Sequence, residues 1–155
     1  MHNLVEKLLD ANKTISSMES CTGGCFANSL TDISGASDVF KFGAVTYSNE
    51  FKIKLGVNSE TINKYTVYSK EVAREMAYNI SIYADSNYGI GITGQLKKVD
   101  MKNPFGACNH VYICIYDRDN DQYFDKEFDV TFNARRANKI VIVNTVVEYL
   151  LKIVR

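Results

Sequence analysis

The sequence predicts an α/β fold with a mixed central sheet of about five strands, covered by helices on both faces. Segments with helical spacing of apolar residues alternate with short runs rich in β-branched residues along most of the chain. Near the end, two strand-like runs are separated only by a polar turn, which predicts an antiparallel hairpin. A length of 155 residues suits one domain with its own core, so residues 1–155 are expected to form a single domain.

Composition narrows the class of protein. Eighteen basic and eighteen acidic residues cancel, which argues against a nucleic-acid-binding protein. The N-terminus has no signal-peptide pattern, and no apolar run approaches the length of a membrane span, so a cytoplasmic protein without membrane contact is expected. Four cysteines are then expected to be reduced, and with only two histidines no metal or other cofactor is expected.

The first elements surround a glycine-containing turn. Leu4, Val5, Leu8 and Leu9 recur at helical spacing and predict an amphipathic helix over the first dozen residues. Residues 13–17 favour a strand, and residues 25–30 favour a helix. Residues 18–24 must therefore turn sharply from strand to helix.

The turn itself offers chemistry. Ser20 lies at its rim, and Gly23 and Gly24 allow an anion or a carbonyl oxygen to approach main-chain N–H groups that have no partner within the helix. The alternative is that Ser20 or Thr22 only caps the following helix.

The middle of the chain is expected to bring polar residues to a second strand end. After a polar loop at 32–37, residues 39–47 predict a strand with an internal glycine. Tyr47, Ser48 and Asn49 end this strand, and Lys52 follows within a turn. Three helices are then expected: a short one closed by residues 55–58, a second over 59–65, and a long one capped by Ser69, with Val72, Met76, Ile80 and Tyr83 on its buried face.

The remaining elements complete the sheet. Residues 88–92 predict a buried strand ending in Thr93 and Gly94, and the loop from Gln95 to Ala107 is expected to be either functional or disordered. Residues 111–116 and 122–128 form the predicted hairpin. The last helix is expected to bury one stripe of residues: Ile140, Val143, Val147, Leu150 and Val154.

Few residues can activate Ser20 as a nucleophile. With two histidines, one of them at the N-terminus, a Ser-His-Asp triad is hard to assemble, and Lys52 is the remaining base. To act near pH 7, its pKa must fall by about three units from 10.4, at a cost of roughly 4 kcal/mol. Tyr47 could relay or orient the proton, whereas the alternative for Lys52 is a solvated helix lysine. Main-chain donors at the glycine turn and at Thr93–Gly94 could serve either acyl transfer or phosphate binding.

Several motifs together closely resemble the CinA C-terminal domain family. They occur in the family's order and cover most of the chain: Glu19–Gly24, Thr31–Ser37, Gly43–Lys52, Leu55–Val57, Val67–Ala73 and Gly91–Gly94. The resemblance implies a three-layer α/β/α fold and a competence/damage-inducible CinA-like protein that forms a homo-oligomer. It also implies a nicotinamide mononucleotide deamidase of NAD salvage (the pyridine nucleotide cycle), which hydrolyses the carboxamide to nicotinic acid mononucleotide and ammonia.

Residue by residue, the resemblance implies a site. Ser20 would be the nucleophile and Lys52 its base, with Tyr47 as the third catalytic residue, and the small-molecule nucleotide would be held by six residues: Thr22, Gly23, Gly24, Asn49, Thr93 and Gly94.

The sequence departs from the family pattern in two segments. The usual glycine-rich loop after Gly94 is replaced by residues 95–100, and residues 130–132 lack the expected arginine, leaving Arg135 and Arg136 nearby. The alternative to the amidohydrolase is therefore an inactive or repurposed CinA-like protein that binds a nucleotide or a protein partner.

Overall fold

The described chain is organised around one mixed sheet. A computed structural model describes residues 1–96, 101–102, 104 and 108–155. Its strands are β1 (Ile15–Glu19), β2 (Phe40–Val45), β3 (Tyr88–Gly94), β4 (His110–Asp117) and β5 (Gln122–Asp129), in the order β2-β1-β3-β4-β5. β1 pairs in parallel with both β2 and β3, whereas β3, β4 and β5 pair antiparallel. The predicted mixed sheet and its late hairpin are confirmed.

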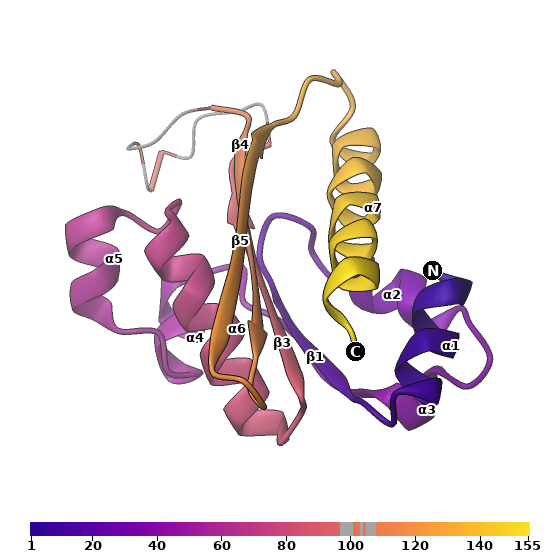
Figure 1. Cartoon of the computed structure of the whole chain (residues 1–155). Coiled ribbons are helices and arrows are strands. Elements are labelled where there is room, and N and C mark those ends of the chain that lie inside the picture. Colours follow the sequence, from indigo (N-terminus) through magenta and orange to yellow (C-terminus); the bar gives the residue numbers. More distant parts are fainter. Residues whose placement is uncertain (97–100, 103, 105–107) are drawn as a thin grey trace.

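Helices cover both faces of this sheet (Figure 1). One layer holds α1 (His2–Asp10), α2 (Cys25–Thr31), α3 (Ala36–Val39) and α7 (Arg135–Ile153), and the other holds α4 (Asn49–Lys54), α5 (Ser59–Tyr65) and α6 (Lys70–Ala84). The three-layer α/β/α arrangement is therefore confirmed.

The alternation of side chains along β1 separates the two cores. Ile15 belongs to the apolar cluster beneath α1, α2 and α7, whereas Met18 belongs to the cluster beneath α5 and α6. Ser20 follows Met18 at the same strand spacing, so its side chain is directed toward the α4–α6 layer. That layer contains Lys52.

Close packing of α6 on β3 depends on glycine. A Cβ at Gly91 would lie 2.7 Å from the main-chain nitrogen of Ala77 and closer still to the carbonyl oxygen of Ala73. Only a residue without a side chain permits this approach. The long helix capped by Ser69, whose hydroxyl accepts a hydrogen bond from the Val72 N–H, is thereby held directly against the central strands.

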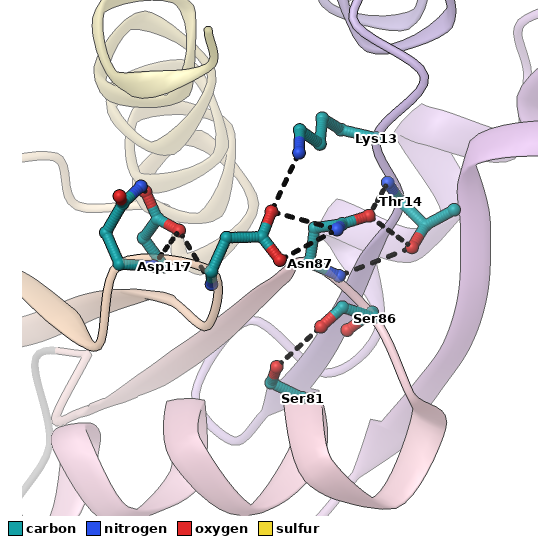
Figure 2. Close-up of polar contacts among 8 residues, drawn as sticks. Lys13, Thr14, Ser81, Ser86, Asn87 and Asp117 are labelled. Atoms are coloured by element: carbon teal, nitrogen blue, oxygen red, sulfur yellow. Dashed lines mark hydrogen bonds and ion pairs between the residues drawn. The ribbon is translucent and has the colours of Figure 1, made fainter.

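The opposite end of the sheet, where β1 and β3 begin, is closed by internal polar contacts (Figure 2). The Asn87 side-chain oxygen accepts a hydrogen bond from the Thr14 N–H at 2.9 Å, and the Lys13 ammonium lies 2.8 Å from the Asp119 carboxylate. Asp117 accepts a bond from the Asp119 N–H in the β4–β5 turn. These groups satisfy one another, in contrast to the end of the sheet where β1, β2 and β3 terminate.

Three local predictions were wrong. Tyr83, expected on the buried face of the long helix, is 66% exposed, because the buried face of α6 ends at Ile80 and Ser81. A short helix, α3, begins at Ala36 inside the predicted loop. Ile140 is 48% exposed, whereas the other four residues of the predicted stripe are buried. Ile142, Val146 and Ile153 are buried as well, because α7 carries apolar residues on more than one face. Of the loop predicted at 95–107, residues 97–100, 103 and 105–107 lie outside the described residues. Across the described ranges, no helix combines the length and the apolar character needed to cross a membrane.

Candidate active site

Ser20 sits where β1 turns into α2. Its main-chain N–H donates to the Ile92 carbonyl at 3.0 Å, which extends the pairing of β1 with β3 by one residue. Its carbonyl accepts from the Gly23 N–H, also at 3.0 Å, and closes a tight turn. Gly23 and Gly24 have φ values of +61° and +88°, which favour glycine. The glycines of the motif thus allow the chain to reverse directly behind the serine.

Lys52 meets Ser20 from α4. Its Nζ lies 3.0 Å from the Ser20 Oγ and 2.6 Å from the Thr46 carbonyl oxygen. The Lys52 side chain is 1% exposed and Ser20 is 6% exposed, so the alternative of a solvated helix lysine is wrong. Residues 46–48 separate β2 from α4, Ser48 is the N-cap of this helix, and Lys52 is its buried residue.

The main chain of Thr46, the residue directly after β2, connects Ser20's strand with Lys52. The Thr46 N–H donates at 2.8 Å to the carbonyl of Glu19, the residue directly before Ser20. The Thr46 carbonyl then accepts from Lys52. One short segment therefore links the nucleophile's strand to the amine.

A cavity of about 780 Å³ opens above Ser20. This volume is in the range of small-molecule sites in proteins. The cavity is lined by Ser20, Cys21, Val45, Tyr47, Ser48, Asn49, Phe51, Tyr68, Gly94, Gln95, Leu96, Lys102 and Arg135. Lys52 is not among these lining residues, but it contacts the hydroxyl of Ser20, which is one of them.

A guanidinium enters the cavity from the first residue of α7. Arg135 donates to the Leu96 carbonyl at 2.8 Å and to the Tyr47 hydroxyl at 3.3 Å. Lys102 adds a second cationic side chain to the same lining. Residues 130–132 lack the arginine of the family pattern, but Arg135, a few residues later, lines the cavity.

The substrate-binding residues expected from the resemblance fall into two groups. Asn49 and Gly94 line the cavity, whereas Thr22, Gly23, Gly24 and Thr93 do not. The Thr93 hydroxyl instead donates to the Val67 carbonyl at 2.9 Å and ties β3 to the loop before α6.

The first amides of α2 are bound by a carboxylate rather than by a capping hydroxyl. Gly24 is the N-cap and offers no side chain. The Glu19 carboxylate accepts from the Phe26 N–H at 3.1 Å and from the Ala27 N–H at 2.9 Å. The alternative in which Ser20 or Thr22 caps the helix is therefore wrong.

The thiol beside Ser20 is not a competing nucleophile. Burial raises the pKa of the Cys21 thiol to about 12, so it is protonated at neutral pH. The four cysteines are free, and the described residues contain no cluster of three metal-binding side chains.

Comparison with known proteins places this geometry in a family. The model of the CinA C-terminal domain matches residues 1–154. The chain belongs to the CinA C-terminal domain family. A competence-damage inducible protein of Clostridium botulinum is 42% identical over 138 residues, covering 87% of the chain and 32% of the relative. A CinA-like protein of Endomicrobium trichonymphae is 40% identical over 146 residues, covering 92% and 33%. The chain thus spans about a third of the length of these curated relatives.

Solved structures of the family share the fold. The competence/damage inducible protein CihA of Agrobacterium tumefaciens superposes with a TM-score of 0.87 at 27% identity, covering 97% of this chain and 90% of that one. A CinA superfamily protein of Escherichia coli gives a TM-score of 0.86 at 23% identity, covering 98% and 89%. The latter likeness supports the fold alone.

Three groups at the site were not singled out from the sequence. Thr46 accepts the Lys52 hydrogen bond through its main-chain carbonyl, a group that no sequence pattern marks. The inward direction of Arg135 depends on how α7 is placed. Glu19 did carry a signal, because a carboxylate shortly before a helix start is a common partner for unpaired amides.

Proposed function

We propose that this chain is an amidohydrolase that converts nicotinamide mononucleotide to nicotinic acid mononucleotide and ammonia. The observation that carries the proposal is the contact of 3.0 Å between the Lys52 Nζ and the Ser20 Oγ at the floor of a cavity. This distance lies within the range required of a nucleophile and its base. Family membership and the retained Glu19–Gly24 motif support the choice of substrate.

Burial prepares Lys52 for the role of base. Lys52 is 1% exposed, and burial in general disfavours the charged form of an amine. A neutral amine that donates one N–H to the Thr46 carbonyl keeps its lone pair available for the Ser20 proton. The main-chain carbonyl therefore orients the base.

The reaction then has two halves. Lys52 takes the Ser20 proton while Oγ attacks the carboxamide carbon, and the resulting ammonium returns that proton to the leaving nitrogen as the C–N bond breaks. Ammonia departs and leaves an ester on Ser20. Water attacks this ester with Lys52 as base, the proton returns to the Ser20 Oγ, and the carboxylic acid product is released.

Main-chain donors beside Ser20 suit the oxyanion of each half. Within the described ranges, no acceptor on another residue is found for the N–H groups of Cys21, Thr22 and Gly24. Cys21 lines the cavity directly after the nucleophile. A donor of this kind is typically worth about 3–4 kcal/mol of transition-state stabilisation.

The phosphate is expected at the Arg135 side of the cavity. Glu19 already occupies the Phe26 and Ala27 amides, so the start of α2 presents a carboxylate and would repel a phosphate. Arg135 and Lys102 supply positive charge at the cavity instead. The Tyr47 hydroxyl binds Arg135 and the ring is 66% exposed, which favours a role in holding this cation over a proton relay.

Two variants test the proposal, each with a matched control. Ser20→Ala and Lys52→Met should abolish release of nicotinic acid mononucleotide, measured by chromatography. Ser17→Ala, a buried serine on the same strand, and Lys54→Met, an exposed lysine on the same helix, should retain it. Equal product from Ser20→Ala and the wild-type chain contradicts the proposal. Ligand-induced thermal stabilisation without product would favour the alternative, a nucleotide-binding protein without turnover.

The resemblance also leads us to propose a single domain over residues 1–155 that forms a homo-oligomer in the cytoplasm. Sedimentation velocity at micromolar concentration tests the assembly, and a purely monomeric profile contradicts it.

A further inference from the structure

A buried carboxylate that the proposed chemistry does not use lies directly before the nucleophile. Glu19 is 1% exposed, and both of its carboxylate oxygens are hydrogen-bonded to α2, through the Phe26 and Ala27 N–H groups. Burying a charge is costly unless it is well bonded. The chain therefore retains an expensive group at this position, and its contacts indicate what that group achieves.

Glu19 connects the two elements that carry the reacting pair. Its side chain fixes the start of α2, and so holds the far end of the turn that begins at Ser20. Its carbonyl accepts from the Thr46 N–H, and Thr46 in turn accepts from Lys52. Both sides of the Ser20–Lys52 contact thus depend on contacts of this one residue.

The turn has no other anchor of this kind among the described residues. The N-cap of α2 is Gly24, which lacks a side chain, and the Thr22 hydroxyl is buried without a hydrogen-bond partner. The Gly23 N–H donates back to Ser20 itself and so gives no connection outside the turn. Main-chain hydrogen bonds also join the turn to α2, from the Cys25 N–H to the Thr22 carbonyl at 3.3 Å and from the Asn28 N–H to the Gly24 carbonyl at 2.9 Å. Among the described residues, Glu19 adds the side-chain contact to the start of this helix.

We propose that Glu19 is a positioning residue that sets the distance between the Ser20 Oγ and the Lys52 Nζ by clamping the start of α2. It touches neither the cavity nor the reacting atoms. This inference rests on the proposed serine–lysine chemistry.

The test compares Glu19→Gln with Ser17→Ala and the wild-type chain. Glutamine has nearly the same shape but only one acceptor oxygen, and its NH₂ group faces the second amide. Ser17 lies two residues earlier on β1, is equally buried, and its hydroxyl has no hydrogen-bond partner among the described residues. Ser17→Ala therefore controls for any change at a buried polar position of this strand.

Loss of positioning lowers kcat and spares substrate binding. We expect Glu19→Gln to reduce kcat for nicotinamide mononucleotide by about 10²-fold, the cost of a misplacement near 1 Å, with KM within twofold of wild type. Ser17→Ala should change neither. A kcat for Glu19→Gln within threefold of wild type, in a chain that folds normally by circular dichroism, overturns the proposal, and so does a fall in kcat shared by Ser17→Ala.

A second readout is independent of the natural substrate. The rate at which a fluorophosphonate modifies Ser20, followed by intact mass, reports activation of the serine by Lys52. If the wild-type chain is labelled but does not hydrolyse nicotinamide mononucleotide, the proposed substrate fails, and slower labelling of Glu19→Gln alone still supports the positioning role. Equal labelling of the three proteins overturns that role, and absence of labelling in the wild-type chain overturns both.

Discussion

Replacing Gly91 by alanine should destabilise the fold strongly, because β3 and α6 approach each other at this residue without room for a side chain. An added Cβ would lie 2.7 Å from the Ala77 nitrogen, whereas ordinary contact begins at 3.4 Å. The main chain of α6 must therefore move away by at least 0.7 Å, the difference between these distances, and further at the Ala73 carbonyl. Overpacking a well-filled core typically costs about 1–3 kcal/mol, and the atoms here are main chain rather than flexible side-chain ends.

We accordingly expect Gly91→Ala to lower the free energy of unfolding by about 3 kcal/mol, measured by urea denaturation, and the melting temperature by about 10 °C. Gly43→Ala on β2 is the matched control, since the nearest atom there is the far end of the Phe40 ring at 2.8 Å, which can rotate away. A loss below about 1 kcal/mol for Gly91→Ala, or an equal loss for Gly43→Ala, would refute this reasoning about backbone contact.

Two substitutions and one thiol-labelling experiment test the site and its surroundings. Arg135→Gln should raise KM for nicotinamide mononucleotide by roughly 10–100-fold, the worth of a charged hydrogen bond, but leave KM for the riboside without phosphate nearly unchanged, whereas Arg136→Gln, outside the cavity lining, should alter neither. Cys108 is exposed and should react with a thiol reagent at pH 8 in the native protein, whereas Cys21, whose pKa burial raises to about 12, should react only after unfolding. The hydrogen bond from Lys13 lowers the pKa of Asp119, so its contribution is present above the unfolded pKa near 4 and is lost as the pH falls through the folded value. Asp119→Asn should therefore flatten the acid decline of the melting temperature, and an unchanged decline would argue against that contribution.

Periodicity and turn residues sufficed to predict most of the fold. The helix over 59–65 and the cap at Ser69 were obtained from local patterns, and the hairpin from its polar turn. The buried stripe of α7 was predicted correctly at Val143, Val147, Leu150 and Val154. Ile140 was misassigned because a helix rich in valine and isoleucine has no single apolar face in its sequence. That choice is made by the sheet and by α1, which are distant along the chain.

The candidate site was predictable only in part, for a different physical reason. Ser20 and Lys52 belong to short motifs with a recognisable pattern, so both could be identified as candidate site residues from the sequence. The contacts that orient them do not, because the Thr46 carbonyl and the turn amides are main-chain groups that every residue carries. Arg135 was noted only as lying near a missing arginine, and its entry into the cavity depends on the angle at which α7 leaves β5.

Charge placement explains how one glycine turn can serve acyl transfer rather than phosphate binding. A glycine-containing strand-to-helix turn offers amides that suit any anion, and such turns often hold phosphate. Here Glu19 supplies an internal anion to two amides of α2, while the amides of Cys21, Thr22 and Gly24 have no acceptor on another residue in the described part of the chain. Under the proposed function, the permanent negative charge of a phosphate would be directed to Arg135, and the transient charge of an oxyanion to the donors beside Ser20. Removing the Glu19 charge should weaken this division, so the positioning of the nucleophile and the choice of anion are two consequences of the same buried carboxylate.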